Sequence, residues 1–99
     1  MSFSSKTVVI TGASEGIGRA LALELAADRP RLVLAARSAD RLAATAAECR
    51  ACGAEVLEVP TDVSERAQCE RLIEHAAAAF GGIDALVNNA GITMWSRFD

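Results

Sequence analysis

The chain of 99 residues contains no tyrosine, one tryptophan, three phenylalanines and one histidine. Because hydrophobic residues make up 52% of the chain and aromatic residues only 4%, its core has to be built from alanine, valine, leucine and isoleucine. Such a core suits a parallel sheet covered by helices on both faces, whose strands read as short aliphatic runs. A single histidine also argues against a zinc site, which needs about four protein ligands.

Long hydrophobic runs and clusters of one charge are absent too. The amino terminus has no apolar segment typical of a secretory signal, and the longest apolar runs, residues 32–36 and 76–80, are far too short to span a bilayer. The basic residues are scattered and the net charge is −3, which offers no electrostatic surface for nucleic acid. Three cysteines, an odd number, fit a reducing compartment. We therefore expect a cytoplasmic protein that binds neither membranes nor nucleic acid.

Two of the cysteines, Cys49 and Cys52, form a C-x-x-C pair that could indicate redox or metal chemistry. A redox pair needs its first cysteine at the N-terminus of a helix, whereas these two fall at the end of an expected helix. We interpret both as ordinary helix residues and expect no metal site.

Short aliphatic runs alternate with longer segments of helical periodicity. Strands are expected at residues 7–11, 32–36, 55–59 and 84–88, with a helix between each successive pair. Right-handed crossovers turn this β-α-β-α-β-α-β order into an α/β fold, a Rossmann-type doubly wound parallel sheet with strand order 3-2-1-4. All 99 residues would belong to one domain.

Periodic apolar residues and end signals define the three helices. In the first, Ile17, Leu21 and Leu25 mark one face, and the second is expected over residues 39–52. Ser64 is a good N-cap for the third helix, which would end at the two glycines after Phe80.

The most informative segment is residues 11–18, which read Thr-Gly-Ala-Ser-Glu-Gly-Ile-Gly between the first strand and the first helix. Glycines let backbone N–H groups approach a phosphate closely, and the following helix points its positive dipole end at the anion. The spacing is Gly-x-x-x-Gly-x-Gly, and no Lys-Ser or Lys-Thr of a P-loop follows. The segment predicts a backbone site for a pyrophosphate.

Polar or glycine-containing segments also follow the other three strands. They are Arg37-Ser38, Thr61-Asp62-Val63 and Asn89-Ala90-Gly91. Because the carboxyl ends of parallel strands meet at one edge of a sheet, these segments should converge with the glycine-rich turn. This convergence is more specific than the glycine motif alone.

Together, Thr11 to Gly18, Asp62-Val63 and Asn88-Asn89-Ala90-Gly91 resemble the short-chain dehydrogenase/reductase family, in its compact single-domain branch. The resemblance covers nearly the whole chain and implies an NAD(P)-binding Rossmann fold, with Asn88 bracing the sheet. The implied cofactor-binding residues are Gly12, Ser14, Gly16, Ile17 and Gly18 at the pyrophosphate and ribose, with Glu15 in the same loop; Arg37; Asp62 and Val63 at the adenine; and Asn89, Ala90 and Gly91 along the cofactor ribose.

Arg37 indicates the type of cofactor. Enzymes that prefer NAD usually carry an acidic residue at the end of the second strand to bind the ribose 2′-hydroxyl, but this chain reads Ala35-Ala36-Arg37 there. The planar fork of an arginine suits a 2′-phosphate, so we predict NADP as the cofactor, with NAD less favoured. Glu15 weighs against this choice, because many NADP-preferring members of the family have a basic residue at its position.

The resemblance also implies groups that this sequence lacks. The family's chemistry uses a serine, a tyrosine and a lysine of a Tyr-x-x-x-Lys pair, and no catalytic residue can be assigned within the 99 residues. We therefore expect the N-terminal cofactor-binding half of an NADP-dependent oxidoreductase, a homo-oligomer that acts on a small carbonyl or alcohol substrate. A non-catalytic NAD(P)-binding module or a truncated gene product is the alternative. The fourth strand would then be left as an open sheet edge.

Overall fold

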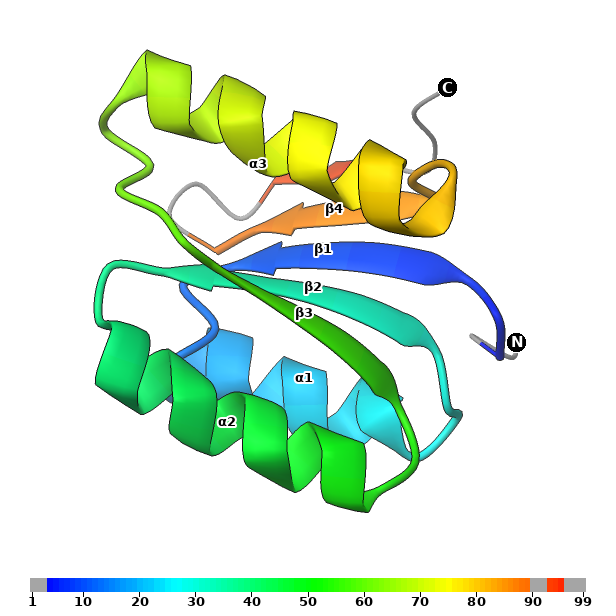
Figure 1. Cartoon of the computed structure of the whole chain (residues 1–99). Helices are drawn as coiled ribbons and strands as arrows, with labels where there is room; N and C mark the ends of the chain where they lie inside the picture. Colours follow the sequence, from blue (N-terminus) through cyan, green and yellow to red (C-terminus); the bar gives the residue numbers. More distant parts are fainter. Residues whose placement is uncertain (1–3, 90–92, 96–99) are drawn as a thin grey trace.

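The structure, a computed structural model, describes residues 4–89 and the backbone of residues 93–95 (Figure 1). All four expected strands and all three expected helices are present, with small shifts at their ends. The elements are β1 (Thr7–Thr11), α1 (Gly16–Ala26), β2 (Arg31–Ala36), α2 (Ala39–Ala51), β3 (Glu55–Pro60), α3 (Arg66–Phe80), β4 (Ala85–Asn88) and β5 (Thr93–Trp95).

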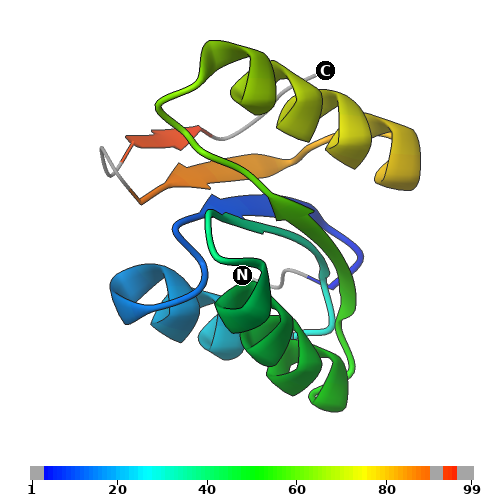
Figure 2. The same cartoon turned by 60° about the vertical axis from the view of Figure 1, so that its left-hand side comes forward.

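The strands form one sheet in the order β3-β2-β1-β4-β5, in which β1 to β4 are all parallel. Helices α1 and α2 lie together on one face of this sheet, and α3 lies on the opposite face (Figures 1 and 2). The predicted doubly wound α/β fold and its strand order 3-2-1-4 are therefore confirmed. The chain adds β2 and β3 on one side of the central strand β1 and then crosses to add β4 on its other side. The strand order therefore reverses between β1 and β4, which is where such sheets bind ligands.

Strand β5 was not expected from the sequence. It pairs antiparallel with β4, with Leu86 opposite Trp95 and Asn88 opposite Thr93. The prediction of an open edge along β4 is therefore wrong for these paired positions. Strand β5 runs along the outer edge of β4 and pairs with backbone groups that would otherwise face solvent.

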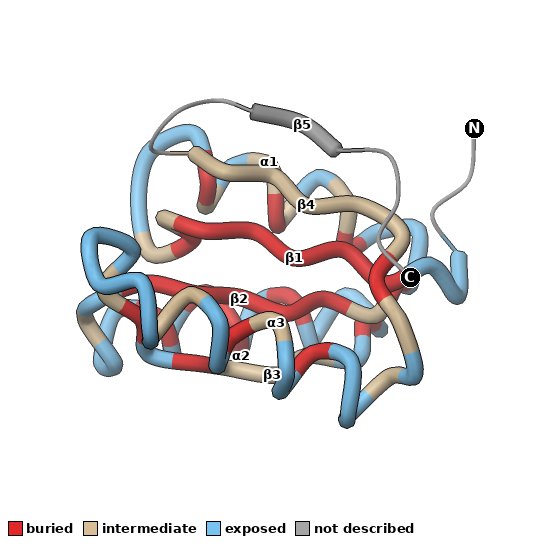
Figure 3. Tube along the Cα trace, turned by 90° about the horizontal axis from the view of Figure 1, so that it is seen from above, coloured by how far each residue is buried: buried red, intermediate tan, exposed pale blue. Residues whose placement is uncertain are grey.

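The core consists of two aliphatic layers that alternate along the central strands. Val8 and Ile10 of β1 face α1 and α2, while Val9 faces α3. The same alternation continues in β2, where Leu34 and Val33 lie in opposite layers. Strands β1 and β2 are buried along nearly their whole length, as Figure 3 shows, because helices cover both faces.

The buried face of α1 differs by one position from the predicted one. Gly18, Ala22 and Ala26 are buried, whereas Ile17 is 70% exposed. Leu21, like the other leucines of α1, only flanks the core. Small residues let the helix axis come closer to the sheet than a stripe of large side chains would, which the apolar periodicity alone does not reveal.

The start of α3 also corrects the sequence analysis. The N-cap is Glu65, whose side chain makes no capping hydrogen bond, and not Ser64. Instead, the backbone N–H and the hydroxyl of Ser64 both donate to the Asp62 carboxylate, at 3.0 and 2.6 Å. The serine therefore closes a turn around Asp62 before the helix begins.

Helix α1 meets the loop after β1 in a backbone contact that only glycine permits. A Cβ atom on Gly18 would lie 2.1 Å from the carbonyl oxygen of Gly12, and a Cβ on Gly12 would lie 2.9 Å from Nδ2 of Asn89. Gly12 also has a φ of +63°, in the left-handed region. The first turn of α1 is thus fixed beside the carboxyl end of β1.

Replacing Gly18 by alanine should destabilise the protein, because the new methyl group must displace the Gly12 carbonyl. We expect a loss of about 1–3 kcal/mol in the free energy of unfolding, the usual cost of overpacking. Urea denaturation of the full-length protein measures it. Gly82→Ala is the matched control, since a Cβ there would meet nothing within 4 Å. Equal stability of the Gly18→Ala and Gly82→Ala proteins would contradict the account.

Candidate functional site

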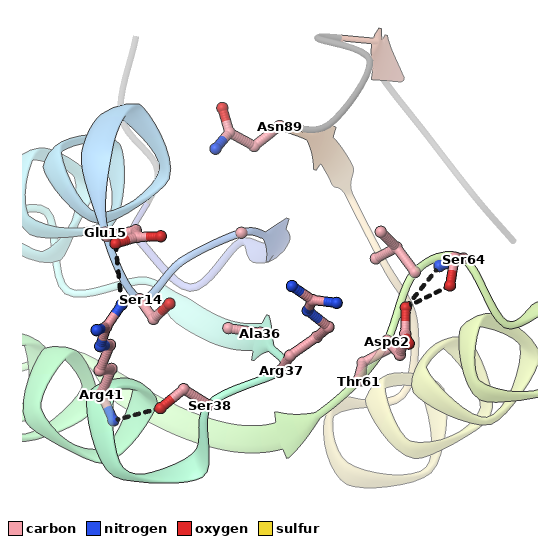
Figure 4. A pocket seen from close by; sticks show the side chains of 12 residues that line it. Ser14, Glu15, Ala36, Arg37, Ser38, Arg41, Thr61, Asp62, Ser64 and Asn89 are labelled. Carbon is pink, nitrogen blue, oxygen red and sulfur yellow. Dashed lines mark hydrogen bonds and ion pairs between the residues drawn. The ribbon is translucent and has the colours of Figure 1, made fainter.

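A pocket of about 460 Å³ opens at the carboxyl ends of the parallel strands (Figure 4). Four loops, one after each of β1, β2, β3 and β4, contribute to its walls, as the sequence analysis expected. The lining residues are Gly12, Ser14, Glu15, Ala36, Arg37, Ser38, Arg41, Thr61, Asp62, Val63, Ser64 and Asn89.

Backbone hydrogen bonds hold the loops in place around the pocket. The N–H of Ala13 donates to the carbonyl of Ala35 at 3.1 Å, which ties the glycine-rich loop to the end of β2. The N–H of Thr61 donates to the carbonyl of Ala36 at 2.8 Å and extends the β2–β3 pairing by one residue. Both bonds extend the sheet itself, so the pocket floor is a continuation of its backbone pairing.

Thr11 joins the glycine-rich loop to the loop after β4. Its hydroxyl accepts from the N–H of Asn89 at 3.0 Å and lies 3.2 Å from Oδ1 of Asn88, to which it can donate. The Asn89 side chain in turn lies over Gly12. This arrangement agrees with the expected bracing role of Asn88 and places Asn89 at the pocket wall.

The glycine-rich loop presents backbone in a form suited to an anion. Gly16 has a φ of +61°, and no atom lies within 4 Å of where its Cβ would be. It is also the first residue of α1, whose first N–H groups have no acceptor within the helix and carry the positive end of its dipole. The space beside Gly16 could therefore accept a phosphate group.

Two arginines and two carboxylates supply the charge at the pocket. The Arg37 side chain points into its centre (Figure 4), and in the described part of the chain it takes part in no ion pair. Arg41 instead pairs with Glu15, with Nη1 and Oε2 3.1 Å apart. Arg37 is thus the guanidinium best placed to bind a ligand anion.

Asp62 lies in the turn that Ser64 closes. The hydrogen bonds from the Ser64 hydroxyl and N–H hold the pKa of the Asp62 carboxyl below its usual range, and the positive charge of Arg37 lowers it further. Asp62 is therefore ionised at neutral pH. Its backbone N–H donates to Oε1 of Gln68 at 2.7 Å, which fixes the turn against the first turn of α3.

Most of the candidate residues meet at this pocket, but not all of them. Gly16, Ile17 and Gly18 lie in α1 and do not form its wall, while Ala90 and Gly91 are outside the described residues. Those that line the pocket are Gly12, Ser14, Glu15, Arg37, Asp62, Val63 and Asn89.

Sequence reasoning missed several lining residues, of which Arg41 matters most. Its position, three residues after the N-cap Ser38 of α2, would have placed it in the first turn of a helix that starts at the pocket. Ser38 caps this helix by accepting from the Arg41 N–H at 3.3 Å. The capping pattern was readable from the sequence, but the ion pair with Glu15 was not.

The two cysteines of the C-x-x-C pair differ in exposure, since Cys49 is buried and Cys52 is exposed. Cys49 is buried in the core, and burial raises the pKa of its thiol to about 11. Among residues 4–89 no three His, Cys, Asp or Glu side chains gather where they could bind a metal ion.

None of α1, α2 and α3, the helices of the described residues, is long and apolar enough to cross a membrane.

Comparison with known proteins assigns the family. Residues 6–99 match the family model described as short chain dehydrogenase, which covers nearly the whole chain. The chain belongs to the short-chain dehydrogenase/reductase family, and the predicted resemblance is confirmed.

Curated relatives in the family are oxidoreductases about three times as long as this chain. A 1,6-dihydroxycyclohexa-2,4-diene-1-carboxylate dehydrogenase from Acinetobacter baylyi is 43% identical over 95 residues, which are 96% of this chain and 36% of that protein. A sepiapterin reductase from Chlorobaculum tepidum is 45% identical over 92 residues, which cover 86% of this chain and 38% of that protein.

Solved structures of the family share the fold and include both cofactor types. L-sorbose reductase from Gluconobacter frateurii, in complex with NADPH and L-sorbose, superposes with a TM-score of 0.86 at 43% identity, over 92% of this chain and 35% of that one. A short chain dehydrogenase/reductase from Burkholderia phymatum, in complex with NAD, superposes with a TM-score of 0.82 at 45% identity. The match covers 87% of this chain and 31% of that one. Family membership alone therefore leaves NAD and NADP both open.

The turn at Asp62 gives a testable pKa effect. Ser64→Ala removes the largest contribution to the lowered pKa, so the pKa of Asp62 should rise, and by more than in Arg37→Gln. NMR titration of the Asp62 carboxyl carbon measures both shifts. If the pKa of Asp62 rose more in Arg37→Gln than in Ser64→Ala, the charge of Arg37 and not the Ser64 hydrogen bond would be the larger cause of the lowered pKa, which would contradict this explanation.

The same shift has a consequence for stability. Because the folded-state pKa of Asp62 is lowered, its ionised form contributes stability at pH values above the unfolded pKa, and this contribution is lost as the pH falls through the folded pKa. As the pH falls from above the unfolded pKa to below the folded pKa of Asp62, the free energy of unfolding should therefore decrease less in the Ser64→Ala protein than in the native protein.

Proposed function

We propose that these residues form the dinucleotide-binding part of an oxidoreductase that transfers hydride between NADP(H) and a small carbonyl or alcohol substrate. The observation that carries this proposal is the position of Arg37, an unpaired guanidinium among the described residues at a pocket built from all four strand ends. Families of this fold bind their nucleotide at that edge of the sheet.

The individual walls suit successive parts of a dinucleotide. The pyrophosphate would lie at the glycine-rich loop and the N-terminus of α1, where open space at Gly16 admits it. The adenine would lie between the β2 and β3 loops, beside Asp62 and Val63, with Asn89 along the ribose nearer the nicotinamide. Val63, 38% exposed, offers an apolar surface for the base.

The end of β2 favours NADP over NAD. NAD-binding sites of this type use an acidic side chain there to accept from the ribose 2′-hydroxyl, and here Ala36 and Arg37 line the pocket instead. A guanidinium can form two parallel hydrogen bonds with a phosphate and carries the opposite charge. The NADPH complex of L-sorbose reductase shows that the fold takes this cofactor in a relative 43% identical to the chain.

Hydride transfer itself would come from the bound nicotinamide, and the substrate oxygen would need a proton donor. These 99 residues contain no tyrosine to fill that role, so they are assigned cofactor binding and no catalytic step. Oxidation of NADPH by the full-length protein with a panel of aldehydes, ketones and quinones separates an oxidoreductase from a non-catalytic binding module. Tight cofactor binding without turnover of any of these compounds would favour the module.

The cofactor preference is tested by Arg37→Ala in the full-length protein. Loss of a charged hydrogen bond should weaken NADPH binding by about 1.5–3 kcal/mol and leave NADH binding nearly unchanged. Isothermal titration with both cofactors measures the two affinities. The control is Arg66→Ala, which removes an exposed arginine of α3 that pairs with Glu70 away from the pocket. Equal losses for NADPH and NADH would refute the role of Arg37.

A further inference from the structure

We propose that Arg41 is a second ligand for the ribose 2′-phosphate, and that Glu15 withholds it from the cofactor through their ion pair. The proposal rests on the proposed function, because it names a selectivity device within the same site. Glu15 would then lower the affinity for NADP(H) in two ways. Its ion pair would keep Arg41 from the 2′-phosphate, and its own negative charge would repel the phosphates. Its removal should release Arg41 to the cofactor.

The two residues meet at the rim of the pocket from different helices. Glu15 is the N-cap of α1, and its side chain makes no capping hydrogen bond, so the carboxylate is available to Arg41. Arg41 stands in the first turn of α2, which Ser38 anchors directly after Arg37. Figure 4 shows Arg37 and Arg41 on either side of Ser38, both at the pocket, with only Arg41 turned to Glu15.

The ion pair is weak enough to be exchanged. The Arg41 and Glu15 side chains are 66% and 73% exposed, and pairs so open to water contribute little to stability. A phosphate monoester carries more than one negative charge at neutral pH and binds arginine through charge-assisted hydrogen bonds. A phosphate at Arg37 would therefore compete with Glu15 for the neighbouring guanidinium.

A second ion pair also joins the two helices. Arg19 of α1 pairs with Glu48 of α2, and neither residue lines the pocket. Buried residues of both helices, among them Ala22 of α1 and Leu42 of α2, also belong to the same aliphatic core. The Arg19–Glu48 pair thus supplies a matched control in which a glutamate–arginine bridge between the same helices lies away from the proposed phosphate site.

The test is a double-mutant cycle in the full-length protein with Glu15→Gln, Arg41→Gln and the combination. Ligands are 2′-phospho-ADP-ribose and ADP-ribose, which differ only in the 2′-phosphate, together with NADPH and NADH. Glu15→Gln should raise the affinity for 2′-phospho-ADP-ribose and NADPH about two- to fivefold, the scale of surface charge effects, and should change the affinity for ADP-ribose and NADH less. Glu48→Gln should change none of the four.

The combination of variants decides between withholding and simple repulsion. If Arg41 turns to the phosphate once Glu15 is gone, Arg41→Gln should cost more affinity in the Glu15→Gln background than in the native protein. If both side chains acted only as independent charges, the two effects would add, and that result would overturn the proposal. Thermal unfolding of each variant confirms that the fold is kept.

Failure of the proposal is distinguishable from failure of the proposed function. Absence of binding of all four ligands to the native protein would reject the dinucleotide site, and the inference with it. Binding of NADPH that depends on Arg37, combined with additive effects of Glu15 and Arg41, would keep the site and reject only the withholding of Arg41.

Discussion

The candidate site depends on the contact between Gly18 and the carbonyl of Gly12. No side chain fits at position 18, because its Cβ would lie 2.1 Å from that oxygen. The contact brings the first turn of α1 against the loop that leaves β1, so the positive end of the helix lies beside the pocket. A helix displaced outward by a larger residue would move the N–H groups away from any phosphate held there.

The remaining walls follow from the parallel order of the strands. Each crossover returns the chain to the same edge of the sheet, so the segments after β1, β2, β3 and β4 all begin at that edge. Their convergence follows from the topology and needs no further contacts between the loops. Short bonds such as Thr61 N–H to the Ala36 carbonyl make these loops continuations of the sheet. Support from the sheet would let a few polar groups bind a flexible dinucleotide at low entropic cost.

The fold and most of the candidate site were predictable from the sequence, because aliphatic runs and glycines report directly on burial and backbone conformation. The buried face of α1 was predicted wrongly, since periodicity favours large residues such as Leu21 whereas close packing uses Gly18 and Ala22. Ser64 was misassigned because a serine can close a turn on Asp62 as well as cap a helix.

Two further features could not be read from the chain for a different reason. The antiparallel pairing of β5 depends on the direction the chain takes after β4, and three residues carry no periodic signal of it. The ion pair of Glu15 with Arg41 joins surface groups 26 positions apart in sequence. Their proximity follows only once α1 and α2 are placed on the same face of the sheet.

In the proposed function, the four strand-end loops form one dinucleotide site with Arg37 at the adenine ribose. A crystal structure of the full-length protein with NADPH tests it most directly. We expect the pyrophosphate at the N-terminus of α1 beside Gly16, and the 2′-phosphate within hydrogen-bonding distance of the Arg37 guanidinium. A cofactor bound with its adenine ribose away from the end of β2, or with its pyrophosphate away from α1, would contradict the account.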